Sequence, residues 1–193
     1  MRERVCIGGH EFETFRSLRL LGRDGQNMPV DSPLNVGDVW DLELSQRENV
    51  TPPHVEDVLV RRGHHIERIE PLGDFLRERA QPWRGDASGV FDSCLATSAS
   101  GRGYVPVGGP LPARSTGYWL PDTPLRRQLF DDSINYRCAQ TSQLRLIRYV
   151  GIDDGPAVIR VGDLVRVSLL RRFQSSAGDS GFWLQLSGVF PLG

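Results

Sequence analysis

Histidine and cysteine are the side chains that most often bind a metal ion, and their spacing in this chain predicts no such site. The chain has four histidines and three cysteines. It contains no Cys-x-x-Cys and no His-Glu-x-x-His segment, the spacings that bring ligands together around zinc. We expect the adjacent His64 and His65 in a solvated turn, and Cys6, Cys94 and Cys138 as small core residues with reduced thiols. No metal site is therefore expected.

Side chains that could act as nucleophiles or general bases show no catalytic arrangement either. A Gly-x-Ser-x-Gly segment is absent, and Cys94 could meet a histidine only through the folding of distant segments. Asp131-Asp132 and Asp153-Asp154 are paired carboxylates in turn-like contexts, where aspartate is common. All 23 basic residues are arginines, which excludes a catalytic lysine, and Gly101-Arg-Gly103 matches no phosphate-loop spacing. We expect no catalytic residues and no cofactor.

The charge of the chain is nearly balanced but unevenly distributed. The net charge is −1; residues 1–50 hold six arginines against nine acidic residues, and residues 136–193 hold seven against four. The acidic N-terminal part and the mildly basic C-terminal part suggest different faces for different partners, although the imbalance is small. The sequence has neither the run of about 18 apolar residues that a membrane helix needs nor the apolar core of a signal peptide. We expect a cytoplasmic protein with no membrane partner.

Two related segments predict the strands that would position functional side chains. Asn35–Leu44 and Arg160–Leu170 both contain Val-Gly-Asp followed by alternating apolar and polar residues. This alternation places the apolar side chains on one face of a strand. Glycine tolerates the positive φ of a tight turn at the strand entry. Ser17–Leu21 is similar to Gln143–Ile147 as well, so the sequence predicts an internal repeat of two small β units.

The segment between the two β units has a different character. Thr51 followed by two prolines and two acidic residues is typical of a helix N-terminus and predicts a helix that ends at Gly63. A second helix is predicted from about Pro71 until Gln81. Residues 83–135 are rich in glycine, proline and aromatic residues, which favours an ordered but irregular connector.

We therefore predict a mainly β fold with two small OB-like barrels. The first barrel comprises residues 1–50 and the second residues 136–193. Residues 51–135 form the α-helical insert and the connector between them.

Four segments resemble the dual OB-containing domain family of bacterial conflict systems. They are Val5–Gly9, Asn35–Trp40, Thr51–Val58 and Phe182–Ser187. The resemblance implies two OB-like barrels, the recognition of a nucleic acid or nucleotide-linked ligand, and a place among the subunits of a defence system. The family often has a further N-terminal strand, which is nearly absent here, so the first barrel could be incomplete. The resemblance transfers no site residue.

Alternation along the strands of the second β unit predicts an outward surface of arginine and aromatic side chains. Arginines neutralise phosphates and aromatic rings stack on bases, the combination with which proteins bind single-stranded DNA or RNA. The candidate residues are Arg145, Tyr149, Arg166, Arg171, Arg172, Phe173 and Trp183.

An adaptor or scaffold that contacts only other subunits is the alternative. Exposed apolar side chains would then mark a protein interface. The candidates, around the proline-rich part of the connector, are Leu120, Leu125, Leu129 and Phe130.

Overall fold

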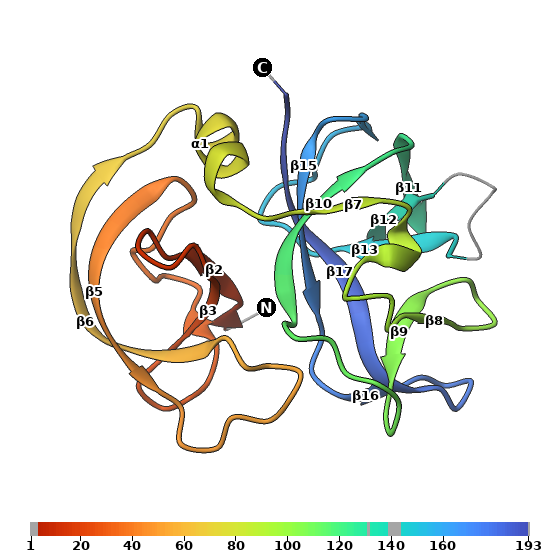
Figure 1. Ribbon diagram of the computed structural model, residues 1–193, viewed down its shortest axis with the longest axis horizontal. Coiled ribbons are helices and arrows are strands. Elements are labelled where there is room, and N and C mark those ends of the chain that lie inside the picture. Colours follow the sequence, from red (N-terminus) through yellow and green to blue (C-terminus); the bar gives the residue numbers. More distant parts are fainter. Residues whose placement is uncertain (1–3, 131, 139–143, 193) are drawn as a thin grey trace. The chain divides into compact units, whose positions relative to one another are not determined.

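The computed structural model describes residues 4–130, 132–138 and 144–192. In this part of the chain the fold is mainly β, with several sheets and one α-helix, which confirms the mainly β content of the predicted fold class. The chain divides into two compact units, Met1–Ala80 and Gln81–Gly193 (Figure 1).

The first unit is a four-stranded sheet with a small two-stranded sheet and one helix. Its elements are β1 (Arg4–Val5), β2 (Ile7–His10), β3 (Ser17–Leu21), β4 (Met28–Pro29), β5 (Asp38–Gln46), β6 (Asp57–Arg68) and α1 (Leu72–Arg79). The strand order of the larger sheet is β2-β3-β6-β5, and β1 pairs with β4. The pairing is antiparallel for β2 with β3, parallel for β3 with β6 and antiparallel for β6 with β5.

The second unit contains a larger sheet of short and long strands. Its elements are β7 (Trp83–Gly85), the 3₁₀ turn η1 (Ala87–Gly89), β8 (Ala96–Thr97), β9 (Gly103–Pro106), β10 (Thr116–Pro121), β11 (Leu125–Phe130), β12 (Ser133–Arg137), β13 (Leu146–Tyr149), β14 (Val158–Ile159), β15 (Leu164–Leu169), β16 (Phe173–Gln174) and β17 (Ser180–Phe190). The main strand order is β14-β11-β12-β13-β17-β15-β10-β7, and β9 and β16 also pair with the long strand β17.

The consecutive strands β10 and β11, which we call the bent segment, pair near opposite ends of this strand order. β10 pairs with β15, while β11 pairs with β12, and only residues 122–124 separate β10 from β11 along the chain. From β11 the order runs antiparallel to β12 and β13, parallel to β17, and antiparallel to β15 and β10.

The two units share a run of strand pairings. In the order β2-β3-β6-β5 and in the order β12-β13-β17-β15 the pairings are antiparallel, parallel and antiparallel. The two Val-Gly-Asp segments lead into β5 and β15, which occupy the same place in the two orders. Gly37 and Gly162 have φ of +93° and +94°, which confirms the predicted need for glycine at these strand entries.

The helix predicted from Thr51 to Gly63 is wrong, because residues 57–68 form β6. The backbone before it closes a turn in which the His54 amide donates to the Thr51 carbonyl oxygen. Val58 and Leu59 then pair with β3 on one side and with β5 on the other. These ladder hydrogen bonds and the tertiary packing outweigh a local helix signal. The second predicted helix is present as α1.

The division into residues 1–50, 51–135 and 136–193 also needs correction. Residues 51–80 belong to the first unit, because β6 completes its sheet. Residues 81–135 belong to the second unit, because β10 and β11 hydrogen-bond to β15 and β12. The predicted connector is therefore a part of the second sheet.

Apolar burial differs between the units. Among the described residues, the second unit contains nineteen buried hydrophobic side chains and the first unit contains four. Trp119, Tyr136, Ile147 and Leu186 are central members of the second core. No helix of the described chain has the length and apolar character needed to cross a membrane.

Candidate nucleic-acid interface

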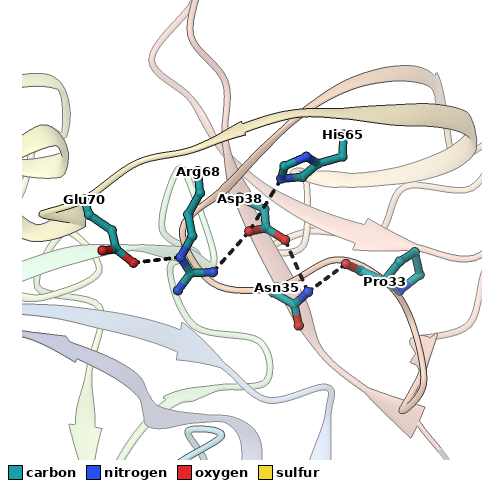
Figure 2. A network of polar contacts seen from close by, with 6 residues as sticks. All are labelled: Pro33, Asn35, Asp38, His65, Arg68 and Glu70. Atoms are coloured by element: carbon teal, nitrogen blue, oxygen red, sulfur yellow. Dashed lines mark hydrogen bonds and ion pairs between the residues drawn. The ribbon is translucent and has the colours of Figure 1, made fainter.

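The charged side chains of β5 and β6 in the first unit are matched to one another. Figure 2 shows Asp38 accepting hydrogen bonds from Asn35 and from Arg68, with N···O distances of 3.2 Å each. Arg68 also donates to Glu70 at 2.8 Å, and His65 Nε2 lies 3.7 Å from Asp38 Oδ1. The pKa of Asp38 is lowered, because these hydrogen bonds outweigh its desolvation, which acts to raise it.

Other arginines of the first unit have carboxylate partners too. Arg4 pairs with Asp24 at 2.9 Å, and Arg62 on β6 pairs with Glu43 on β5. Arg19 and Asp57 are both almost fully buried and lie 3.5 Å apart. These positive charges are neutralised inside the unit, so this surface is a poor site for a phosphate.

The second unit presents arginines from three neighbouring strands on one outward face. Tyr136 on β12 and Ile147 on β13 are buried and directly paired, which fixes the inner face of the sheet. Alternation then places Arg137 and Arg148 on the outer face, and both side chains are exposed. Arg137 lies directly across from the exposed Arg126 of β11. No described residue provides a carboxylate within ion-pair distance of these three arginines.

A fourth arginine reaches this face from the segment before β9. Arg102 Nη2 donates to Asn135 Oδ1 at 3.4 Å, and Asn135 is the residue opposite Arg148 in the β12–β13 register. The pKa of Arg102 is lowered, chiefly by burial and also by the positive charge of Arg148. Two guanidinium groups therefore lie close enough to repel each other.

A stacked aromatic pair continues the same face across β17. Tyr104 on β9 and Trp183 on β17 are register partners, and their ring centroids lie 4.9 Å apart with an interplanar angle of 21°. Leu184 is buried, so Trp183 points to the outer side, two residues from Gln185, the partner of Arg148. The Tyr104 hydroxyl donates to Asp179 at 3.3 Å, which holds the tyrosine ring.

We call this surface the arginine–aromatic face. Its residues are Arg102, Tyr104, Arg126, Arg137, Arg148 and Trp183. Backbone pairing connects all the strands that bear them, from β11 through β12, β13 and β17 to β9 (Figure 1).

Several of the residues predicted for nucleic-acid binding lie at or beside this face. Trp183 belongs to it, and its Nε1 donates to the Phe173 carbonyl oxygen at 3.2 Å. Phe173 is exposed on β16, directly after the exposed Arg171 and Arg172. Arg145 is exposed, and its side-chain carbons lie against Gly101, the neighbour of Arg102.

Two other predicted residues are elsewhere. Tyr149 is 7% exposed and packs in the core, where its hydroxyl donates to Asp153, so its outward assignment is wrong. The alternation of β13 requires this, because Ile147 is also buried and shares its side of the strand. Arg166 faces outward from β15 but is half-buried and donates to the Ser187 hydroxyl at 2.9 Å.

Of the residues predicted for a protein interface, some are buried and others are exposed. Leu125 is 1% exposed and belongs to the core, because it is the first residue of β11 and pairs with the fully buried Ile159; its interface assignment is wrong. Leu120 is half-buried. Leu129 and Phe130 are 71% and 60% exposed at the end of β11.

Sequence reasoning missed five residues of the arginine–aromatic face. Tyr104 and Arg126 were assigned to an irregular connector, although Leu125–Phe130 has a run of polar residues between apolar ones. Arg102 is distant in sequence from Arg137 and Arg148, and strand pairing brings the three together. The one available signal was the excess of arginine over acidic residues in this part of the chain.

The described residues contain no group of three or more His, Cys, Asp or Glu side chains placed to bind a metal ion. The chain matches no protein-family model, no curated protein and no solved structure at a significant level.

Proposed function

We propose that the second unit binds single-stranded nucleic acid on the arginine–aromatic face. The observation that carries the proposal is the combination on one surface of four arginines without a carboxylate partner among the described residues and a stacked Tyr104–Trp183 pair. Guanidinium groups bind phosphates, and an exposed ring edge or face adds stacking with bases. This function requires no catalytic residue.

The strand order supports an OB-type barrel as the framework. If the bent segment β10–β11 is the first strand, then β12, β13, β15 and β17 follow as strands two to five. Their pairing order, 1-2-3-5-4-1 with strands three and five parallel, is that of a five-stranded Greek-key barrel. Oligonucleotides bind OB folds on the face of strands two and three and on the loops after strands one and four. Arg137 and Arg148 lie on those two strands.

The shared pairing run supports a related framework for the first unit. The strands β2, β3, β5 and β6 correspond in this reading to strands two to five, with no first strand among the described residues. We therefore propose that the two units share a common ancestor, in agreement with the resemblance to the dual OB-containing domain family. We extend this proposal to the whole protein, which would act as a recognition subunit in a bacterial defence system.

The difference in charge supports assigning the binding to the second unit. Residues 81–193 contain twelve arginines and nine acidic residues, while residues 1–80 contain eleven and fifteen. The net charges are +3 and −4, so a polyanion is attracted to the second unit and repelled by the first.

Fluorescence anisotropy with labelled single-stranded DNA and RNA at two salt concentrations tests the proposal. If the four arginines together neutralise two phosphates, the affinity falls about seven-fold between 50 and 200 mM salt. Replacing Arg137 and Arg148 with glutamine weakens binding, whereas Arg62→Gln in the first unit, the matched control, does not. The absence of binding at both salt concentrations would refute the proposal.

An adaptor function is a second candidate because Leu129 and Phe130 are exposed side by side at the end of β11. Apolar side chains with this exposure are typical contacts for another protein. In that case Leu129→Ser removes a subunit that co-purifies with the wild-type protein, while the arginine variants retain it.

A further inference from the structure

We infer that the four arginines form two phosphate sites that hold neighbouring phosphates of a strand lying along β12. The inference rests on the proposed function and defines its contact register. The first site is the cross-strand pair Arg126–Arg137, and the second is the pair Arg102–Arg148, joined through Asn135.

The spacing between the two sites comes from β12 itself. Arg137 belongs to the first site, and Asn135, which orients Arg102 and opposes Arg148, marks the second. Two residues along a strand span about 6.6 Å and return to the same face. Neighbouring phosphates of an extended single strand are separated by a similar distance, so each pair can take one phosphate.

Each pair is an unfavourable arrangement of like charges in the absence of an anion. Directly opposed like charges on neighbouring strands destabilise a sheet. Arg126 and Arg137 are opposed in this way, and the proximity of Arg148 acts on the protonation of Arg102. No described carboxylate is placed to relieve either pair. A phosphate between two guanidinium groups replaces this repulsion with charge-assisted hydrogen bonds.

Asn135 prepares the second site for its ligand. The side chain is fully buried, donates to the Ser133 carbonyl oxygen at 3.0 Å and accepts from Arg102 at 3.4 Å. Because both ends of the amide are engaged, Arg102 is held at the sheet surface before a ligand arrives. We assign Asn135 as a positioning residue and Arg102 as a binding residue.

The aromatic pair defines the side to which the bases extend. Trp183 and Tyr104 lie beyond Arg148 as seen from β12, because β13 and then β17 and β9 follow in the sheet. Phosphates along β12 and bases directed towards β17 therefore occupy one continuous surface.

Short thymidine oligonucleotides test this register by calorimetry. The trinucleotide TpTpT has two phosphates and fills both sites, whereas TpT has one and fills a single site. The logarithm of the affinity should depend on the logarithm of salt with a slope of about −1.4 for TpTpT and about −0.7 for TpT. The double variants Arg126→Gln/Arg137→Gln and Arg102→Gln/Arg148→Gln should each reduce the TpTpT slope to about −0.7.

The outcomes separate this inference from the proposed function. Wild-type binding with a TpTpT slope that neither double variant changes would overturn the two sites and leave nucleic-acid binding in place. Failure of the wild-type protein to bind any oligonucleotide would overturn both. Circular dichroism of each variant shows whether it is folded, and the glutamines keep most of the side-chain length at the exposed Arg126, Arg137 and Arg148 and at the half-buried Arg102.

Discussion

The two units of this chain differ in the partners of their arginine side chains. In the first unit Arg68 bridges Asp38 and Glu70, and Arg62 meets Glu43 across the β5–β6 pair (Figure 2). In the second unit Arg126, Arg137 and Arg148 have no such partner among the described residues. Both units have the same run of strand pairings, so the framework does not dictate this difference. In the first unit these charges are neutralised internally, and we propose that in the second unit an external anion neutralises them.

The units also differ in how well their sheets are covered. The inward residues of β15, Val165 and Val167, are fully buried, whereas the corresponding Trp40 and Leu42 of β5 are only half-buried. The second unit contains the segment β10–β11, which pairs with both β15 and β12. The first unit has no equivalent strand among the described residues. A well-covered core makes the second unit the more rigid framework for a binding face.

The largest expected effect concerns these two cores. Trp119→Ala removes a large side chain that is 2% exposed in the second unit, and we expect it to lower the free energy of unfolding by about 3–5 kcal/mol. The matched variant Trp40→Ala removes a half-buried side chain and should cost less than half as much. Urea denaturation of each variant measures the two values. Equal losses would show that the first sheet is as well packed as the second.

The next largest effect is on ligand affinity. Replacing Arg102, Arg126, Arg137 and Arg148 together with glutamine should reduce the affinity for single-stranded DNA at least a hundred-fold at low salt, because both arginine pairs that contact phosphates disappear. A matched set in the first unit, Arg4, Arg16, Arg62 and Arg68, should leave the affinity almost unchanged. Anisotropy titrations of the two variants compare them. A larger loss from the first-unit set would reverse the comparison between the units.

The aromatic pair should contribute a smaller amount. Trp183→Ala removes a stacking surface worth about 1–3 kcal/mol per base, so the affinity should fall about ten-fold. The dependence on salt should stay the same, because no charge is lost. The control is Trp40→Ala in the first unit, which should not weaken binding. A change in the salt slope of the Trp183 variant would place the ring in a role other than stacking.

The smallest effect is the response of stability to pH, and it has opposite directions in the two units. Burial raises the pKa of Tyr136 to about 12, while the tyrosine of an unfolded chain titrates near 10. Its folded-state pKa is raised, so the stability it contributes to the second unit is lost as pH rises from about 10 towards 12. The pKa of Asp38 is lowered, so its contribution to the first unit is lost as pH falls below about 4.

Hydrogen exchange followed by mass spectrometry distinguishes the two directions. At acid pH, peptides from β5 and β6 should open before those from the second core, and at alkaline pH peptides from β12 and β13 should open first. Tyr136→Phe should remove part of the alkaline loss. Simultaneous opening of both units at both extremes would contradict this assignment.

The sequence predicts the parts of this fold that depend on local pattern. Alternation identified β5, β15 and β17, the Val-Gly-Asp segments identified two glycines with positive φ, and α1 was predicted from its apolar spacing. The predicted helix at Thr51–Gly63, which is wrong, concerns a segment whose prolines and acidic residues are typical of a helix N-terminus. Hydrogen bonding to β3 and β5 decides its structure, and those partners cannot be inferred from the segment itself.

The arginine–aromatic face was only partly predictable, for the same reason. Trp183 was found because β17 alternates regularly, whereas Tyr149 was misplaced by one position in the alternation of β13. Arg102 and Arg148 are 46 positions apart and meet only through the sheet. Their lack of acidic partners among the described residues is a property of the folded surface, which neither composition nor spacing contains.

Cross-linking of a photoreactive single-stranded oligonucleotide, with identification of the linked peptides by mass spectrometry, tests the central claim most directly. The proposal predicts that the cross-links concentrate on residues 102–104, 126–137, 145–148 and 171–183, and that the quadruple arginine variant of the second unit loses them. Cross-links concentrated on β5 and β6, from a protein that binds the oligonucleotide, would contradict the assignment of binding to the second unit.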